Sequence, residues 1–94
     1  MEPEAARQAS AIAETAASQT RMTARDRASV LSRTAKALEQ SAILAEQHAQ
    51  RRERAGRMDA AAQERRAAGR AHQAAARARA QAEEWLKLLE GPET

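Results

Sequence analysis

The stretch Arg51-Arg52-Glu53-Arg54-Ala55-Gly56-Arg57-Met58-Asp59 decides how this chain folds. Gly56 is the only glycine before Gly69, and proline is absent from Glu4 to Gly91. On each side of Gly56 lies a long run rich in Ala, Glu, Gln and Arg, which are good helix formers. Glycine reaches the positive φ that ends a helix at little cost. The stretch therefore predicts a turn at Gly56 that joins two long helices into an antiparallel hairpin.

Upstream of Gly56, small and apolar residues recur at alternating spacings of four and three. The positions are Ala24, Ala28, Leu31, Ala35, Leu38, Ala42, Ala45 and Ala49, followed by Arg52 and Gly56. This spacing is the heptad pattern of a coiled coil. Every seventh residue from Ala28 to Ala49 is alanine, so we expect two helix backbones to approach unusually closely. Val30, Ala37 and Leu44 widen the stripe on one flank.

Downstream of the turn, Asp59 is a suitable N-cap for a second helix. A second seam follows at Ala60, Glu64, Ala67, Ala71, Ala74, Ala78, Gln81, Trp85 and Leu88. The sequence Glu90-Gly91-Pro92 is a typical helix end. The pattern thus predicts hairpin helices over residues 24–55 and 58–90.

The N-terminal part of the chain predicts a further helix over residues 3–20. Pro3 suits a first helical turn, and Ala5, Ala9, Ile12 and Ala16 share one face. Thr23 and Asp26 resemble a capping box, which favours a break near residues 20–23. The alternative is one continuous helix through to Arg54.

The predicted fold is a single all-α domain over residues 1–94. It is an alanine-rich, coiled-coil-like antiparallel helical hairpin with an additional N-terminal helical segment. Alanine supplies 27 of the hydrophobic residues, and an alanine methyl adds under about 1 kcal/mol on burial. We therefore expect a homo-oligomer or a protein partner to complete the core. Two alternatives are one long helix through Gly56 that pairs with another chain, and a disordered chain that folds on binding.

The charge is concentrated near the predicted turn. The net charge is +3 and the isoelectric point about 10.5, with nine arginines against three carboxylates between residues 51 and 82. The predicted anion- or partner-binding residues are Arg51, Arg52, Arg54, Arg57, Arg65, Arg66 and Arg70. Such a surface suits the phosphates of a nucleic acid or an acidic groove on a protein, while the plainer interpretation is a solvated face.

The opposite, open end of the hairpin gathers the large apolar side chains. If the chain folds back at Gly56, Val30 and Leu31 lie near Trp85. The predicted interface residues are Val30, Leu31, Leu38, Trp85, Leu88 and Leu89. Trp85 is the only aromatic residue; it either closes the hairpin or anchors a protein interface.

The sequence gives little support for catalysis, a metal or a cofactor. It has no cysteine and no glycine-rich phosphate loop. Metal sites in helical bundles use Glu three residues before His, but Ala45 precedes His48 and Gly69 precedes His72 in that way. No apolar run could span a bilayer, and the acidic N-terminus is unlike a secretory signal, so we expect a cytoplasmic protein. The Ala and Arg bias is typical of GC-rich bacterial or phage genomes.

One face of the N-terminal segment has Glu14, Ser18, Arg21, Arg25 and Ser29 at spacings of 4-3-4-4. This pattern resembles the Glu-x3-Ser-x2-Arg-x3-Gln-x3-Asp motif of coiled-coil anti-sigma factors that bind cyclic-di-GMP. Glu14, Ser18 and Arg21 match the motif, whereas Arg25 replaces its Gln and Ser29 its Asp. The resemblance implies a nucleotide-sensing regulator in which Glu14, Ser18, Arg21 and Arg25 contact the nucleotide.

We expect a non-catalytic small helical regulator or adaptor that acts through protein–protein interaction. The first alternative is a nucleic-acid-binding accessory protein that uses the arginine-rich end. The second is the cyclic-di-GMP-sensing, anti-sigma-like regulator that the motif implies.

Overall fold

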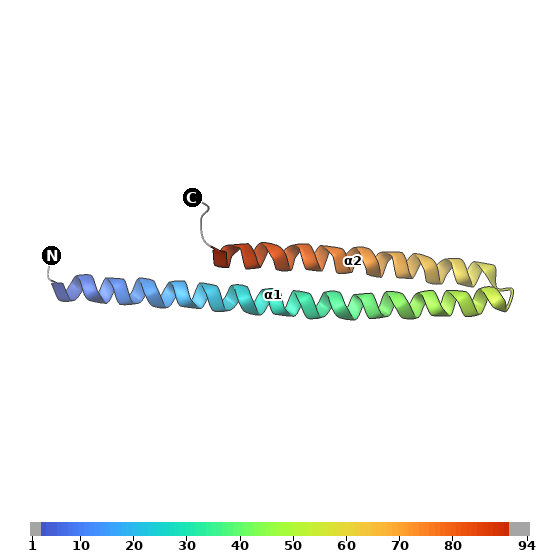
Figure 1. The fold of residues 1–94 in the computed structure, drawn as a ribbon, viewed down its shortest axis with the longest axis horizontal. Coiled ribbons are helices and arrows are strands. Elements are labelled where there is room, and N and C mark those ends of the chain that lie inside the picture. The colour runs from blue at the N-terminus through green and yellow to red at the C-terminus, as the bar shows by residue number, and fades with distance from the viewer. Residues whose placement is uncertain (1–2, 91–94) are drawn as a thin grey trace.

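The chain forms two antiparallel helices joined by a tight turn (Figure 1). The computed structural model describes residues 3–90, in which α1 spans Pro3–Arg54 and α2 spans Met58–Glu90. The molecule extends 81 Å along its longest axis. A helix of 52 residues at 1.5 Å per residue is about 78 Å long, so α1 alone sets this length. The prediction of an all-α helical hairpin is confirmed.

The turn ends α1 with a Schellman motif centred on Gly56. The Gly56 N–H donates to the Glu53 carbonyl at 3.0 Å, and the Arg57 N–H donates to the Arg52 carbonyl at 2.8 Å. These two bonds satisfy carbonyls that the end of the helix would otherwise leave without partners. Gly56 has φ = +76°, a left-handed conformation that favours glycine. The turn therefore excludes one uninterrupted helix within this chain.

α2 begins at Met58, the first residue of the predicted second helix, but its N-cap differs from the predicted one. The Arg57 carbonyl accepts the Ala61 N–H at 3.0 Å, so Arg57 holds the N-cap position and Met58 is the first helical residue. Asp59 lies inside the first turn, and its prediction as N-cap is wrong. After the Schellman turn the chain is already helical at Met58, so the N-cap is Arg57, two residues before Asp59. A carboxylate in the first turn still favours the helix dipole.

Within residues 3–90, every fully buried residue is alanine. On α1 the buried residues are Ala24, Ala28, Ala35, Ala42 and Ala49. Leu31 and Leu38 are half-buried and pack against a cluster of Ala35, Ala75 and Ala78. The predicted α1 seam is thus confirmed from Ala24 to Arg52, including its small residue at every seventh position. Gly56 and the predicted flank of Val30, Ala37 and Leu44 are exposed, so the prediction is wrong at these four positions.

The seam of α2 is shifted by one residue at alternate positions. The buried residues are Ala61, Ala68, Ala75, Ala78 and Ala82. The predicted positions Ala60, Ala67 and Ala74 are only half-buried, and Gln81 and Leu88 are exposed. The prediction was correct at Glu64, Ala71, Ala78 and Trp85, which lie at or beside the contact with α1. Both series have the same 4-3 spacing, so spacing alone does not select the buried one.

Residues 20–23 do not interrupt α1, so the predicted break there is wrong. The Thr20 hydroxyl donates to the Ala16 carbonyl at 3.0 Å, as the Thr15 hydroxyl does to Ala11 at 2.9 Å. Threonine hydroxyls that bond back to the preceding turn are satisfied within a helix and need no cap geometry. The flanking Ala, Gln and Arg residues favour the helix throughout.

The N-terminal part of α1 extends beyond the end of α2 (Figure 1). Residues 3–23 are all exposed, and Ala24 is the first buried residue of α1. We call residues 3–23 the overhang; at 1.5 Å per residue it is about 30 Å long. Its predicted apolar face has no partner among residues 3–90. The predicted helix end at Gly91 and Pro92 lies outside the described residues.

Two glycine-to-alanine substitutions test the turn. Gly56→Ala should destabilise the hairpin by about 1–2 kcal/mol, because a Cβ is unfavourable at positive φ. Gly69→Ala is the matched control: Gly69 is exposed inside α2, and a Cβ there meets nothing within 4 Å. It should stabilise the protein by up to about 1 kcal/mol. Urea unfolding followed by circular dichroism measures both, and a stabilising Gly56→Ala would contradict this turn.

Candidate binding surfaces

One flank of the hairpin is held by ion pairs between α1 and α2. The Arg79 Nη1 donates to Glu39 Oε1 at 3.0 Å, and His72 Nδ1 lies 3.5 Å from Glu39 Oε2. The Arg65 guanidinium donates to the Glu53 carboxylate. This hydrogen bond and the charge of Glu53 raise the pKa of Arg65 above its ordinary value. Glu53 thus bonds across the hairpin, to a residue of α2.

At the turn, the seam itself ends in a charged pair. Arg52 Nε lies 3.5 Å from Glu64 Oε1, and both residues are half-buried. Arg52 and Glu64 were both predicted seam residues, so the last contact of the seam before the turn is an ion pair between two seam positions. Two of the seven predicted anion-binding arginines, Arg52 and Arg65, therefore already face a carboxylate.

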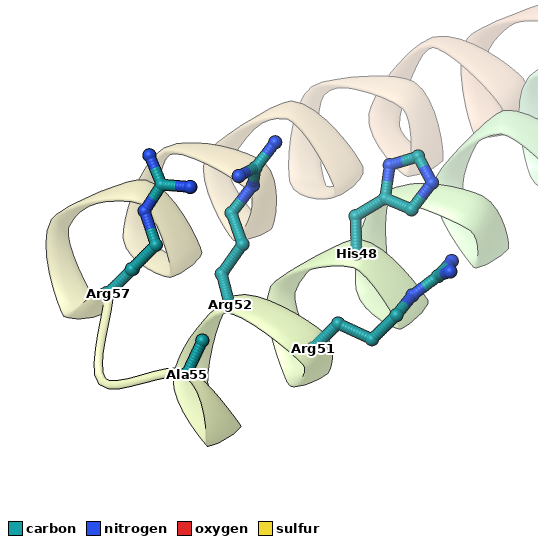
Figure 2. Close-up of a pocket in the computed structure, with 5 residues that line it drawn as sticks. All are labelled: His48, Arg51, Arg52, Ala55 and Arg57. Carbon is teal, nitrogen blue, oxygen red and sulfur yellow. The ribbon is translucent and has the colours of Figure 1, made fainter.

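A shallow hollow of about 320 Å³ lies beside the turn. Its lining residues are His48, Arg51, Arg52, Ala55 and Arg57 (Figure 2). In Figure 2 the side chains of His48, Arg52 and Arg57 project on the same side of the hairpin. We call this set the turn-end basic hollow. It unites three of the seven predicted arginines.

His48 belongs to this hollow because of its position on α1. It is exposed and lies one helical turn from both Arg51 and Arg52. The spacings i, i+3 and i, i+4 place three such residues together on a helix, so the sequence contained this signal. Arg57 joins these residues only because the chain turns at Gly56, so helical spacing could not predict its position.

The other predicted arginines lie outside the hollow. Arg54, Arg66 and Arg70 are exposed. None of the carboxylates within residues 3–90 comes within 4 Å of them. They remain solvated cations at the same end of the molecule.

At the open end, the structure brings together the residues that the fold-back predicted. Val30, Leu31 and Trp85 line a hollow of about 410 Å³ with Asp26, Arg27 and Gln81. The Arg27 guanidinium carbon lies 5.0 Å from the centroid of the Trp85 ring, in cation–π contact. Trp85 is half-buried, so its ring both closes the seam and faces solvent.

The remaining predicted interface residues divide between core and surface. Leu89 is half-buried, and Leu88 is 60% exposed beside Trp85. Leu38 packs in the middle of the seam near Ala75 and is not part of the open end. Val30 is 52% exposed.

The residues of the nucleotide-binding resemblance all lie on α1, at or just beyond the overhang. Glu14, Ser18, Arg21 and Arg25 are exposed. Their 4-3-4 spacing in a continuous helix places them on one face. The Arg21 Nη2 donates to the Ser18 hydroxyl at 3.3 Å.

No group of three His, Cys, Asp or Glu side chains that could hold a metal ion occurs within residues 3–90. Neither α1 nor α2 is long and apolar enough to cross a membrane. No protein-family model matches the chain, and no curated protein or solved structure matches it.

Trp85→Ala tests whether the ring closes the hairpin. Replacing a fully buried Trp costs about 3–5 kcal/mol, so we expect about 1–3 kcal/mol for this half-buried ring. Leu88→Ala is the control from the same end of α2, and a side chain 60% exposed should cost no more than about 0.5 kcal/mol. Urea unfolding at dilute protein concentration measures both. Equal effects would mean that the Trp85 ring is not part of the seam.

Proposed function

We propose that this protein is a non-catalytic helical adaptor or regulator that binds another protein chain through the overhang and the adjoining open end. The main support is the overhang itself, a helix of about 30 Å with no partner among residues 3–90. Ile12 is 70% exposed and Met22 is 62% exposed. The hollow beside Trp85 adjoins the base of the overhang and extends this exposed surface.

The physical argument concerns the stability of a single helix in water. Isolated helices are marginal, and most helical stability in proteins comes from packing an apolar face. The overhang offers such a face at Ala11, Ile12 and Ala16, together with Thr15 and Gln19. Packing against a second helix would bury this face and stabilise the segment.

The partner is another protein helix, from a second copy of this chain or from a different protein. The fully buried side chains within residues 3–90 are all alanine methyls. Further burial of Ile12, Met22 and Val30 would add about 1.5–3 kcal/mol for each fully buried side chain. We place this interaction in the cytoplasm.

A nucleic-acid-binding accessory protein is the competing proposal. It is favoured by the three solvated arginines at the turn, Arg54, Arg66 and Arg70, which no carboxylate within residues 3–90 neutralises. Phosphate contacts of this kind give salt-dependent binding without base selectivity. We favour the protein partner because the three most exposed large apolar side chains, Ile12, Met22 and Leu88, lie away from the turn.

A photo-crosslinking amino acid placed at Ile12 tests the proposal in the producing cell. We expect a discrete adduct with one protein, since Ile12 should lie at the interface. The same amino acid at Gln40 is the control: Gln40 is exposed on the hairpin, away from the overhang. Met22→Glu should abolish the adduct formed at position 12, because a charge would be buried in the contact.

The mass of the adduct distinguishes a second copy of this 10.2 kDa chain from a different protein. Equal crosslinking from positions 12 and 40 would contradict the proposal. So would strong, sequence-independent duplex binding that is lost when Arg66 and Arg70 are replaced together.

A further inference from the structure

The turn-end basic hollow concentrates positive charge in a small concave space. Arg51 and Arg52 lie at the end of α1, and Arg57 is the residue that precedes α2. No carboxylate within residues 3–90 lies within 4 Å of Arg51 or Arg57. Glu64 approaches Arg52 at Nε, and Arg52 also lines the hollow.

We propose that the turn-end basic hollow binds a ligand through two linked phosphate groups, such as pyrophosphate or the diphosphate of a nucleotide. Guanidinium groups bind phosphate oxygens through paired N–H donors, and charge-assisted bonds of this kind are about twice as strong as neutral ones. His48 adds an imidazole N–H donor at the edge of the hollow. The proposal is independent of the protein contact at the open end.

A diphosphate fits this site better than a single carboxylate for two reasons. Three arginines line the hollow and only Arg52 has a carboxylate within 4 Å, that of Glu64, so a ligand with several negative charges balances the site. The hollow of about 320 Å³ also has room for two linked phosphate groups. An extended duplex would instead contact cations spread over a surface, such as Arg54, Arg66 and Arg70 outside the hollow.

The test is calorimetric titration of the full chain with sodium pyrophosphate at constant ionic strength. We expect binding to weaken at least tenfold in Arg51→Gln/Arg57→Gln. The matched control is Arg66→Gln/Arg70→Gln, which removes the same charge outside the hollow and should weaken binding less than threefold. Circular dichroism checks that both variants keep their helicity, and Arg51→Gln alone serves if the first double variant does not fold.

A thermal measurement provides a second readout. Pyrophosphate should raise the melting temperature of the unmodified protein, because a ligand that binds only the folded state stabilises it. Sodium chloride at matched ionic strength should not. Titration with adenosine diphosphate separates the two sources of the ligand: tighter binding than pyrophosphate indicates a nucleotide, and equal binding indicates that only the diphosphate is recognised.

Three results would overturn the proposal. The first is the absence of pyrophosphate binding at millimolar concentration. The second is an equal loss of binding in the two double variants, which would show a general effect of charge. The third is duplex DNA binding that displaces pyrophosphate and depends equally on both arginine pairs.

Discussion

The structure depends on contact between alanine methyls across the two helices. Ala28, Ala35, Ala42 and Ala49 on α1 and Ala61, Ala68, Ala75 and Ala82 on α2 are all buried, and each series repeats every seventh residue. A methyl group is small enough to let the helix backbones approach closely along their whole shared length. Because larger side chains are excluded from these positions, Leu31, Leu38 and Trp85 are only half-buried beside the alanines. Ile12, Met22 and Val30 remain exposed and accessible for partners.

The other features follow from this constraint. The alanine seam fixes the distance between the helices. It specifies their register weakly, because the same small side chain recurs every seventh residue. Register is set by the Schellman turn at Gly56 and by the charged flank, where Glu39 and Glu53 meet basic residues of α2. Since α2 is shorter than the segment of α1 that precedes the turn, the fixed register leaves the overhang beyond Glu90. The same turn brings Arg57 back beside Arg51 and Arg52.

Much of this arrangement could be predicted from the sequence because it depends on periodicity and on Gly56. The α1 seam and the meeting of Val30, Leu31 and Trp85 required only the heptad and a fold-back point. The prediction of the α2 seam was wrong by one residue at alternate positions, because two series of residues on α2 have the same spacing. The buried series has alanine at four positions seven residues apart, from Ala61 to Ala82, which matches the repeat on α1. The basic hollow escaped prediction because Arg57 reaches it only through the backbone geometry of the turn.

The most direct measurement of the central claim is the unfolding free energy of Ala75→Leu compared with Ala76→Leu. Ala75 is fully buried in the seam, whereas its neighbour Ala76 is exposed on the same helix. If close approach of the backbones holds the hairpin, Ala75→Leu should destabilise it by about 1–3 kcal/mol through overpacking. Ala76→Leu should change stability by no more than about 0.5 kcal/mol. A stabilising effect of Ala75→Leu would show that the helices have room for larger side chains and would contradict the account.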